Sequence, residues 1–596
     1  MVAIAIVATL LLVWAVSRQS GPIPWNVVIV TIDTTRADHL GCYGNARAQT
    51  PTLDRLAAEG VRYEACYAPA PLTLPSHCTI MTGLYPFSHG VHDNGEQLDL
   101  AATTLAEVLS DRGYRTGAAV GAFVLDRRFS LDQGFASYDD GMSAGQPETS
   151  LTFAERHAGH VTDSALEFLA KEQKRAYFLW VHYFDPHAPY AAPGYDPQVS
   201  SISAYEAEIS YADKHLDRLI KAIDADKRRQ TLLIVTSDHG EGLMEHGELS
   251  HGTFIYNSTM RVPLIIRKPE LNPAGAVVDV PVTLADVFPS VLAWLGIKKV
   301  GDVHGQVLPL ANSDVKESRL IYLENYGAAN RYGWSKLSGA VRGHDKLIDA
   351  PTPELYDLEK DRHEQHNLLP DQEAVAQEID EALKAFLRER PDHFQNSQLL
   401  VDLQTMRRLA ALGYLGHGST GTVQEGADPK DMITLLPAIY LCQTLIEQGR
   451  NSEAADRLAS ILRERDPSNL RCLWLLASIC PDTKVGTSVV DLLGELAAKP
   501  FPSPLNFILP AKLGQALAAR DRDEEAVVAF RSALAADDKQ AAVHIHLASA
   551  LERLGHLPQA WLDEFETACA LEPDNEDFAR ILKEANKRAE MQPESQ

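Results

Sequence analysis

The chain has 596 residues, too many for a single hydrophobic core, so we expect roughly two to four domains. An apolar fraction of 45% indicates a largely globular protein. The formal charge is −26, and a field of that sign repels nucleic acid and anionic lipid. We therefore expect no nucleic-acid partner, and an anionic substrate would have to be captured by a local cationic site such as a metal ion.

The seven cysteines are odd in number and include no Cys-x-x-Cys pair. This pattern argues against a disulfide framework and against a zinc ribbon. One or two disulfides at most are expected if the protein is exported.

Residues 1–20 contain an apolar stretch that runs from Val2 to Val16. It is short for a spanning helix, which needs about 17–25 residues, and it suits the core of a signal peptide, although basic residues do not precede it. We keep two interpretations, a cleaved export signal and an uncleaved N-terminal membrane anchor. A buried strand or helix is less favoured because Gly21 and Pro22 follow. The protein is expected to be exported, periplasmic or anchored to a membrane.

Continuous apolar runs alternate with amphipathic patterns between residues 25 and 300. Such runs are typical of strands buried on both faces, and their alternation with helices predicts an α/β domain with a mainly parallel sheet. The runs are Asn26–Ile32, Ala176–Phe184 and Thr231–Thr236, and the helical patterns include Thr152–Glu172 and Ala204–Ile223.

Shorter strands and one helix, Gln372–Arg388, predict a small α+β subdomain over residues 301–395. Residues 396–430 are expected to be a linker, because their second half is rich in Gly, Ser, Thr and Asp.

Residues 432–588 are helical in pattern and repetitive. Ala516 and Ala550 lie 34 residues apart, as do Ala526 and Ala560. This period, with small residues at helix crossings, predicts three or four imperfect tetratricopeptide repeats in an all-α solenoid. A plain helical bundle is the alternative. Repeats of this kind predict a protein or peptide partner, although they could instead only order the C-terminus.

Asp33 and Asp238 each follow an apolar run. In open α/β sheets ligands bind at the carboxyl ends of the strands, where a carboxylate is costly unless it is paired or metal-bound. His239 and Gly240 follow Asp238, and a carboxylate with an imidazole suits zinc, manganese or iron better than calcium. A helix cap or a turn is the alternative interpretation of each carboxylate.

Thr73 lies in the segment PLTLPSHC, where Pro75 suits the first turn of a helix. Thr73 is therefore expected just before the helix, where free N–H groups and the helix dipole favour an anion. A metal ion bound to the Thr73 hydroxyl would lower its pKa and make it a nucleophile. An ordinary helix cap is the alternative.

Three further histidines lie in motifs that suit chemistry: His187 in YFDPHAPY, and His246 and His251 in MEHGELSHG. Each could bind an oxyanion or protonate a leaving group. A lone histidine is more often structural.

Taken in order, six segments resemble the motifs of the sulfatase-like branch of the alkaline phosphatase superfamily. They are VVIVTIDTTRADHLGCYG, TPTLDRLAAEGVRYEACYA, LTLPSHCTIMTGLYPFSHGV, YFDPHAPY, TSDHGEGLMEHG and STMRVPLIIR. The resemblance covers about residues 25 to 370 and implies an alkaline-phosphatase-like fold. It also implies one divalent metal ion held by Asp33, Asp238, His239 and Thr73, with Thr73 bridging metal and substrate. Mn or Zn is slightly favoured over Ca or Mg.

The chain departs from the pattern of true sulfatases, which carry Cys-x-Pro-Ser-Arg with a Cys, occasionally a Ser, that is oxidised to formylglycine. Thr73 is not a residue that this modification uses, Cys78 is out of register, and His77 replaces the motif's Arg. Thr34 replaces the family's usual second Asp, and His251 corresponds to a Lys that often binds sulfate. These features resemble the family's phospho-transferases and its phosphonate or phosphodiester hydrolases.

Two hypotheses follow. In the first, the chain is an enzyme in which Thr73 attacks a sulfate, phosphate or phosphonate ester, by hydrolysis or by transfer. His187 and His251 then stabilise the oxyanion or protonate the leaving group, with His77 nearby. In the second, the chain is a catalytically weak scaffold that acts through its repeats.

Overall fold

The computed structural model describes most of the chain. Residues 1–20, the predicted export signal or anchor, and residues 396–425, most of the predicted linker, lie outside the described part, so these two predictions are not tested. No helix among the described residues is long and apolar enough to cross a membrane. The described residues are 25–142, 156–171, 174–196, 203–268, 273–311, 319–390, 394, 426–501 and 504–591.

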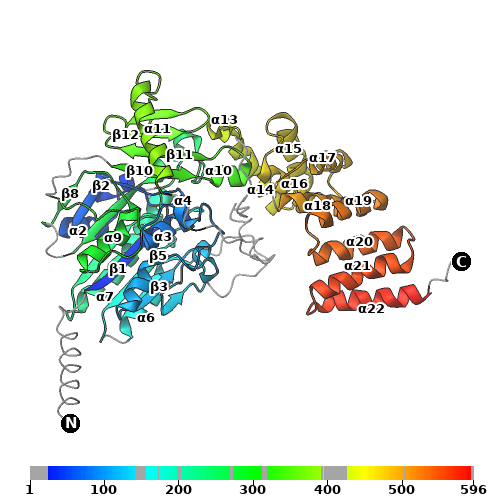
Figure 1. Ribbon diagram of the computed structural model, residues 1–596, viewed down its shortest axis with the longest axis horizontal. Helices are drawn as coiled ribbons and strands as arrows, with labels where there is room; N and C mark the ends of the chain where they lie inside the picture. Colours follow the sequence, from blue (N-terminus) through cyan, green and yellow to red (C-terminus); the bar gives the residue numbers. More distant parts are fainter. Residues whose placement is uncertain are drawn as a thin grey trace, which may run out of the picture. The chain divides into compact units, whose positions relative to one another are not determined.

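A nine-stranded sheet forms the centre of the N-terminal unit, in the order β4-β3-β5-β1-β6-β7-β2-β8, with β9 beside β2 (Figure 1). Most strand pairs are parallel, as predicted, but β7 is antiparallel to both β6 and β2, so the sheet is mixed. The strands are β1 (Asn26–Ile32), β2 (Val61–Tyr67), β3 (Arg115–Val120), β4 (Ser137–Asp139), β5 (Tyr177–Tyr183), β6 (Thr231–Thr236), β7 (Arg261–Arg267), β8 (Ala276–Val278) and β9 (Val282–Thr283).

Helices cover both faces of this sheet. Alternate residues of its central strand point to opposite sides, and because they are apolar on both sides, each face is buried against helices. Val27 and Ile29 of β1 belong to the core that includes α3, α5 and α9, whereas Val28 and Val30 belong to the core that includes α2, α6 and α7. The helices are α2 (Pro51–Glu59), α3 (Thr73–Thr82), α4 (Pro86–His89), α5 (Leu105–Asp111), α6 (Ala158–Ala170), α7 (Ala204–Ala225), α8 (Asn257–Met260) and α9 (Val287–Trp294).

A second, smaller antiparallel sheet, in the order β10-β11-β12-β13, packs against helix α11. Its inward-facing residues, such as Tyr322 and Leu347, contact Ile379 and Leu383 of α11. The elements are β10 (Leu320–Asn325), β11 (Leu337–Arg342), β12 (Asp345–Asp349), β13 (Glu354–Asp357) and α11 (Glu373–Arg388), and helix α10 (Gly327–Tyr332) lies in the connection between β10 and β11.

The C-terminal unit is helical, and from α14 onward every second helix begins 34 to 36 residues after the one before. Ala516, Ala526 and Ala550 are fully buried, but Ala560 is exposed, so the small residue predicted at a helix crossing does not lie at one there. The helices are α13 (Pro429–Met432), α14 (Leu436–Glu447), α15 (Asn451–Glu464), α16 (Leu470–Ile479), α17 (Thr487–Ala497), α18 (Leu505–Ala518), α19 (Asp523–Ala536), α20 (Ala541–Arg553), α21 (Pro558–Leu571) and α22 (Glu576–Met591).

The helical unit also includes residues 328–335, which come from the connection between β10 and β11. Trp334 is 1% exposed, and its indole N–H donates to Oδ2 of Asp466 at 2.8 Å. The Ser335 hydroxyl donates to the carbonyl of Gly426 at 2.6 Å. The helical unit is therefore built from two separate stretches of the chain.

Replacing Trp334 with alanine is expected to lower the free energy of unfolding of the helical unit by about 3–5 kcal/mol, because it leaves a large cavity. Trp334→Phe keeps most of the packing and loses the indole bond to Asp466, so it should cost about 1–2 kcal/mol. Chemical denaturation of the full chain, with limited proteolysis to locate the unfolded part, measures both. Equal stability of the alanine variant and the parent chain would show that this segment is not an integral part of the unit.

Candidate metal centre and active site

Three neighbouring strands, β5, β1 and β6, bring the candidate metal-binding side chains to one edge of the large sheet. β1 lies between β5 and β6, parallel to both, and Thr31 is paired with His182 on one side and with Thr236 on the other. The three strands therefore end together, so Asp33 follows β1 beside His182 of β5 and close to Asp238, which lies just after β6.

Four predicted residues converge at this edge. Nε2 of His239 lies 3.7 Å from Oδ1 of Asp33, 3.5 Å from Oδ2 of Asp238 and 3.4 Å from Oγ1 of Thr73. The two Asp side chains and His239 are fully buried, and Thr73 is 1% exposed. Nδ1 of His239 lies 2.9 Å from the carbonyl of Gly240, which can only accept, so Nδ1 carries the proton and Nε2 presents a lone pair to the other three side chains.

These side chains fit a divalent cation. Both carboxylate oxygens of Asp33 and Oδ2 of Asp238 are buried without a hydrogen-bond partner among the described residues. Unpaired buried carboxylates are costly, and a bound cation removes that cost. Metal–ligand bonds of about 2.0–2.1 Å at tetrahedral angles place donor atoms about 3.3–3.4 Å apart, close to the separations observed here.

The carboxylates and the imidazole also shift one another's pKa. Burial, reinforced by the negative charge of Asp238, raises the pKa of Asp33 well above its ordinary value. Burial opposes the charged form of Asp238, but His239, His77 and His182 together lower its pKa. Burial likewise opposes protonation of His239, but the two carboxylates raise its pKa. The two acids therefore cannot both stay ionised at low cost without a positive charge between them.

Thr73 is the first residue of α3 rather than the residue before it, so the predicted position was wrong by one. Leu72 is the N-cap, because its extended backbone (φ −146°, ψ 138°) ends the preceding loop. The backbone N–H of Leu74 donates to Oδ1 of Asn94 at 2.8 Å, which holds the first turn of the helix. Asn94 is fully buried and was not singled out from the sequence, which offers no local signal for this contact.

His77 lies one turn after Thr73 and faces the sheet. Its Nδ1 donates to the carbonyl of Thr73 at 2.7 Å, and its Nε2 lies 3.0 Å from Oγ1 of Thr31. Burial lowers its pKa to about 3, so the ring is neutral near neutral pH. The structure thus places His77 behind Thr73, where it holds the backbone of the nucleophile candidate.

His187 and His251 lie beside His239. The His251 ring is 4.4 Å from that of His239 and 5.1 Å from that of His187, between centroids. Nδ1 of His251 lies 3.3 Å from Oε1 of Glu241, a fully buried carboxylate that the sequence interpretation missed although it follows Gly240 directly. His246 lies elsewhere, stacked on Tyr256 with 3.7 Å between centroids.

A pair of buried carboxyl groups holds the loop that carries His187. Asp185 accepts from the backbone N–H of Ala158 at 2.6 Å, and Glu208 of α7 accepts from that of Ala191 at 2.6 Å. Glu208 is also hydrogen-bonded to Asp185, and burial together with the charge of Asp185 raises the pKa of Glu208 to about 8. Glu208 therefore stays protonated at neutral pH and shares its proton with Asp185.

Because the pKa of Glu208 lies above its ordinary value of 4.5, its contribution to stability is complete below about pH 4.5 and is lost as the pH rises through about 8. Glu208→Gln keeps an acceptor for Ala191 and a donor for Asp185 but does not titrate. The unfolding free energy of the parent chain is thus expected to fall relative to that of the variant between about pH 6 and pH 9. Denaturant titrations at both pH values measure this difference, and a constant difference would contradict the assignment.

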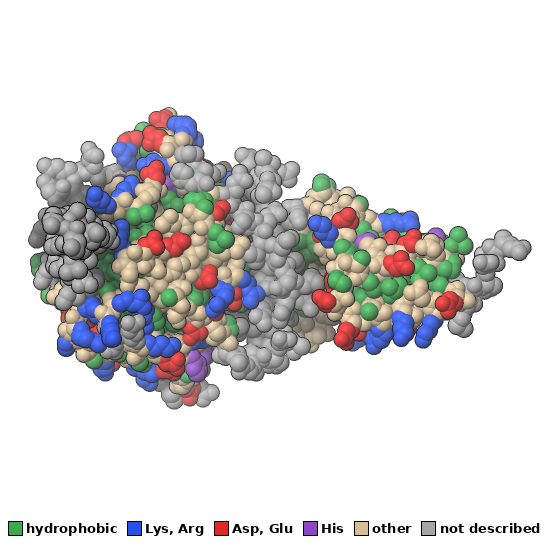
Figure 2. All heavy atoms as spheres, turned by 60° about the horizontal axis from the view of Figure 1, so that its bottom comes forward, with side chains coloured by type: hydrophobic (Ala, Val, Ile, Leu, Met, Phe, Trp, Pro, Cys, Tyr) green, Lys and Arg blue, Asp and Glu red, His purple; other side chains and the backbone are tan. Residues whose placement is uncertain are grey.

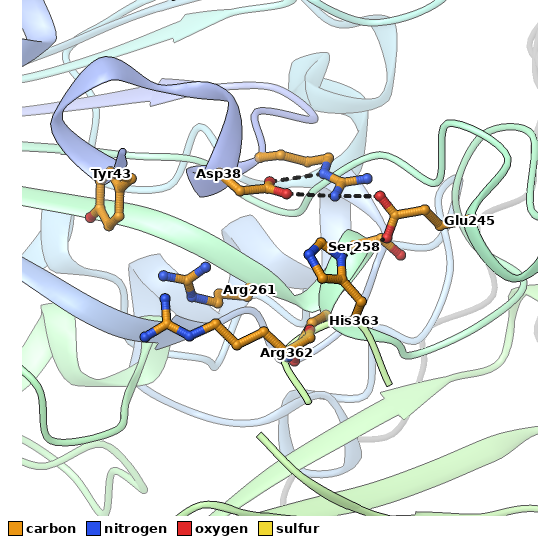
Figure 3. A pocket seen from close by; sticks show the side chains of 9 residues that line it. Asp38, Tyr43, Glu245, Ser258, Arg261, Arg362 and His363 are labelled. Atoms are coloured by element: carbon orange, nitrogen blue, oxygen red, sulfur yellow. Dashed lines mark hydrogen bonds and ion pairs between the residues drawn. The ribbon is translucent and has the colours of Figure 1, made fainter. Parts of the chain in front are cut away.

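A pocket is lined in part by Arg36, Asp38 and Tyr43, which follow Asp33 in the chain (Figure 3). Its cationic wall is formed by Arg261 and Arg362, which both contact Oε1 of Glu64, at 3.0 and 3.2 Å. Two guanidinium groups thus share one carboxylate oxygen in a chain of strongly negative charge. The pocket is lined by Arg36, Asp38, Tyr43, Glu245, Asn257, Ser258, Arg261, Arg362 and His363.

Comparison with known proteins finds two family matches and several similar proteins. Residues 25–297 match the Sulfatase family, and residues 245–392 match the family described as N-sulphoglucosamine sulphohydrolase, C-terminal. An uncharacterized sulfatase, YidJ, from Escherichia coli is 25% identical over 458 residues, which cover 63% of this chain and 89% of the relative. Human arylsulfatase A is 26% identical over 445 residues, covering 61% of this chain and 86% of the relative.

Solved structures show the same fold. The phosphonate monoester hydrolase of Agrobacterium radiobacter superposes with a TM-score of 0.50 at 21% identity, covering 61% of this chain and 96% of the other. A protein solved in complex with its substrate D-glucosamine-2-N,6-O-disulfate superposes with a TM-score of 0.51 at 20% identity, covering 62% and 100%. These superpositions show the fold, and residues 25–297 are similar in sequence to the Sulfatase family.

Proposed function

We propose that the chain is a metal-dependent hydrolase or transferase that cleaves sulfate, phosphate or phosphonate esters through nucleophilic attack by Thr73. The observation that carries this proposal is the position of the Thr73 hydroxyl, 3.4 Å from Nε2 of His239. Beside it lie both oxygens of Asp33 and Oδ2 of Asp238, which have no hydrogen-bond partner among the described residues. A divalent ion held by these side chains would lower the pKa of the hydroxyl and offset negative charge on the transferred group.

In the first step the Thr73 oxygen forms a bond to sulfur or phosphorus, and the bond from that atom to the ester oxygen breaks. The departing oxygen needs a proton. We assign its delivery to His251, because the Glu241 carboxylate beside Nδ1 stabilises the protonated ring. Nδ1 of His187 lies 2.6 Å from the carbonyl of Ala188, and burial lowers the pKa of this ring to about 3, so His187 suits positioning better than proton delivery.

In the second step water, or an alcohol if the enzyme is a transferase, attacks the Thr73-bound group and releases the threonine oxygen. A threonine ester has no second hydroxyl that could expel the group, as a formylglycine hydrate has. External attack is therefore required, and hydrolysis and transfer use the same site.

The class of ester is tested directly with the purified chain loaded with Mn²⁺ or Zn²⁺. Aryl sulfates, phosphate monoesters, phosphodiesters and phosphonate monoesters are offered, and the Thr73-bound intermediate is trapped by acid quench and located by mass spectrometry. Turnover of at least one class, with one sulfuryl or phosphoryl group on Thr73, is the expected result. Turnover with the adduct on another residue would overturn the proposed mechanism.

The scaffold hypothesis is the second candidate, and the helical unit favours part of it. We propose that this unit consists of tetratricopeptide repeats that bind a protein or peptide, since from α14 onward every second helix begins 34 to 36 residues after the one before. Figure 2 shows hydrophobic side chains interspersed with Lys and Arg on this unit, and Val528 and Leu557 are among its exposed hydrophobic residues. A chain that binds no divalent ion and turns over none of the esters would support a scaffold alone.

Export, with residues 1–20 as a cleaved signal or a membrane anchor, stays a proposal. Mass spectrometry of the N-terminus of the protein recovered from its producing cell distinguishes cleavage from anchoring.

A further inference from the structure

His182 is a fully buried histidine of β5 that the sequence interpretation did not single out. Neither of its ring nitrogens has a hydrogen-bond partner among the described residues. Its Nε2 lies 3.4 Å from Oδ2 of Asp33, an oxygen that also has no hydrogen-bond partner there. A buried imidazole whose nitrogens make no hydrogen bond lowers the stability of the folded protein unless a bound ion or other ligand contacts one of the nitrogens.

The neighbouring His77 provides a contrast, because its hydrogen bonds are complete. The indole N–H of Trp180 donates to Oγ1 of Thr31 at 3.1 Å, which leaves the Thr31 hydroxyl proton for Nε2 of His77 at 3.0 Å. Nδ1 of His77 then donates to the carbonyl of Thr73. Each proton in this series of hydrogen bonds has an acceptor. His77 therefore needs no further ligand, although it also lies near Asp238.

The separation between His182 and Asp33 is that of two ligands on one ion. It equals the 3.4 Å between Thr73 and His239 and falls within the range expected for tetrahedral donors with bonds of about 2.0–2.1 Å. His182 and Asp238 also lie close enough to share a cation. Asp33 and Asp238 thus each lie close to both His182 and His239.

We propose that His182 is a ligand of the same metal ion as Asp33, Asp238 and His239. The proposal rests on the metal centre of the proposed function and extends it. Two imidazoles with two carboxylates select zinc, manganese or another transition metal over calcium and magnesium, which prefer all-oxygen sites. The centre is therefore expected to discriminate against Ca²⁺.

The first test counts imidazole ligands in the unmodified chain loaded with Mn²⁺, by electron spin echo envelope modulation. Two coordinated histidines are the expected result, and a single one would overturn the assignment of His182. Because this measurement uses the parent protein, it does not depend on whether a variant folds.

The second test compares the Zn²⁺ affinities of two variants by competition with a chelator. His182→Gln is expected to weaken binding by at least about 100-fold, whereas His77→Gln, which changes a ring without a free lone pair, should weaken it by less than about 10-fold. Equal effects of the two substitutions would contradict the proposal.

The outcomes also separate this inference from the proposed function. If the chain binds Mn²⁺ through one histidine and Thr73 still carries the intermediate, only the role of His182 fails. If no divalent ion binds to the parent chain, both the metal centre and the role of His182 fail.

Discussion

Thr73→Ala is expected to lower kcat/KM for whichever ester the enzyme cleaves by about 10⁴-fold or more, because it removes the atom that forms the covalent intermediate. The residual rate would come only from binding and electrostatic stabilisation by the remaining groups. Steady-state kinetics with the preferred ester measure the loss. Thr73→Ser keeps a hydroxyl at the same position and should retain far more activity than the alanine variant.

Thr82 provides a matched control in the same helix. It is 1% exposed and its hydroxyl donates to the carbonyl of Cys78 at 2.7 Å, so Thr82→Ala also removes a buried threonine hydroxyl from α3. This variant is expected to lose some stability and to keep its activity. Comparable activity in Thr73→Ala and Thr82→Ala would rule out Thr73 as the nucleophile.

Removal of divalent ions is expected to abolish turnover and to destabilise the N-terminal unit, since it leaves Asp33 and Asp238 buried close together without a compensating charge. A ligand that binds only the folded state stabilises it by about 4 kcal/mol when its free concentration is about 1,000 times Kd. The Tm of the unit should therefore rise steeply on titration with Zn²⁺ or Mn²⁺. Differential scanning calorimetry of chelated and reloaded protein measures the shift.

Asp238→Asn should remove both the activity and the metal-dependent rise in Tm. Asp213 is the matched control, because it is also a buried aspartate and accepts from the backbone N–H groups of Thr52 and Leu53 at 3.0 and 2.9 Å. Asp213→Asn is expected to lower the Tm in both states and to leave the metal-dependent shift intact. A metal-dependent rise that persists in Asp238→Asn would contradict the proposed centre.

Much of the α/β domain follows from local patterns. Residues 26–32 and 231–236 form strands with the predicted bounds, because an unbroken apolar run of this length can be satisfied only between two covered faces. Helix α7 begins where Ser203 and Glu206 form a capping box, a signal that is entirely local. The antiparallel direction of β7 was not predicted, since strand direction depends on how the connecting chain folds back.

The sequence predicted those residues of the candidate site that have a metal-binding side chain and also directly follow a predicted buried strand. Asp33, Asp238 and His239 follow buried strands, and strand ends are where α/β sheets bind ligands. His182 lies inside an apolar run, so its sequence context is that of a core residue. Only the parallel register of β5 with β1 places it beside Asp33.

The sequence by itself determined the class of the domain, the strands that form its centre, and the nucleophile and metal-ligand candidates, because apolar periodicity and short polar motifs are local properties. The tertiary structure alone decided that His77 turns toward the sheet, that Glu241 supports His251, and that residues 328–335 belong to the helical unit. Each of these arrangements brings together residues that are separated in the sequence. Their contacts depend on tertiary packing, which local sequence patterns do not encode.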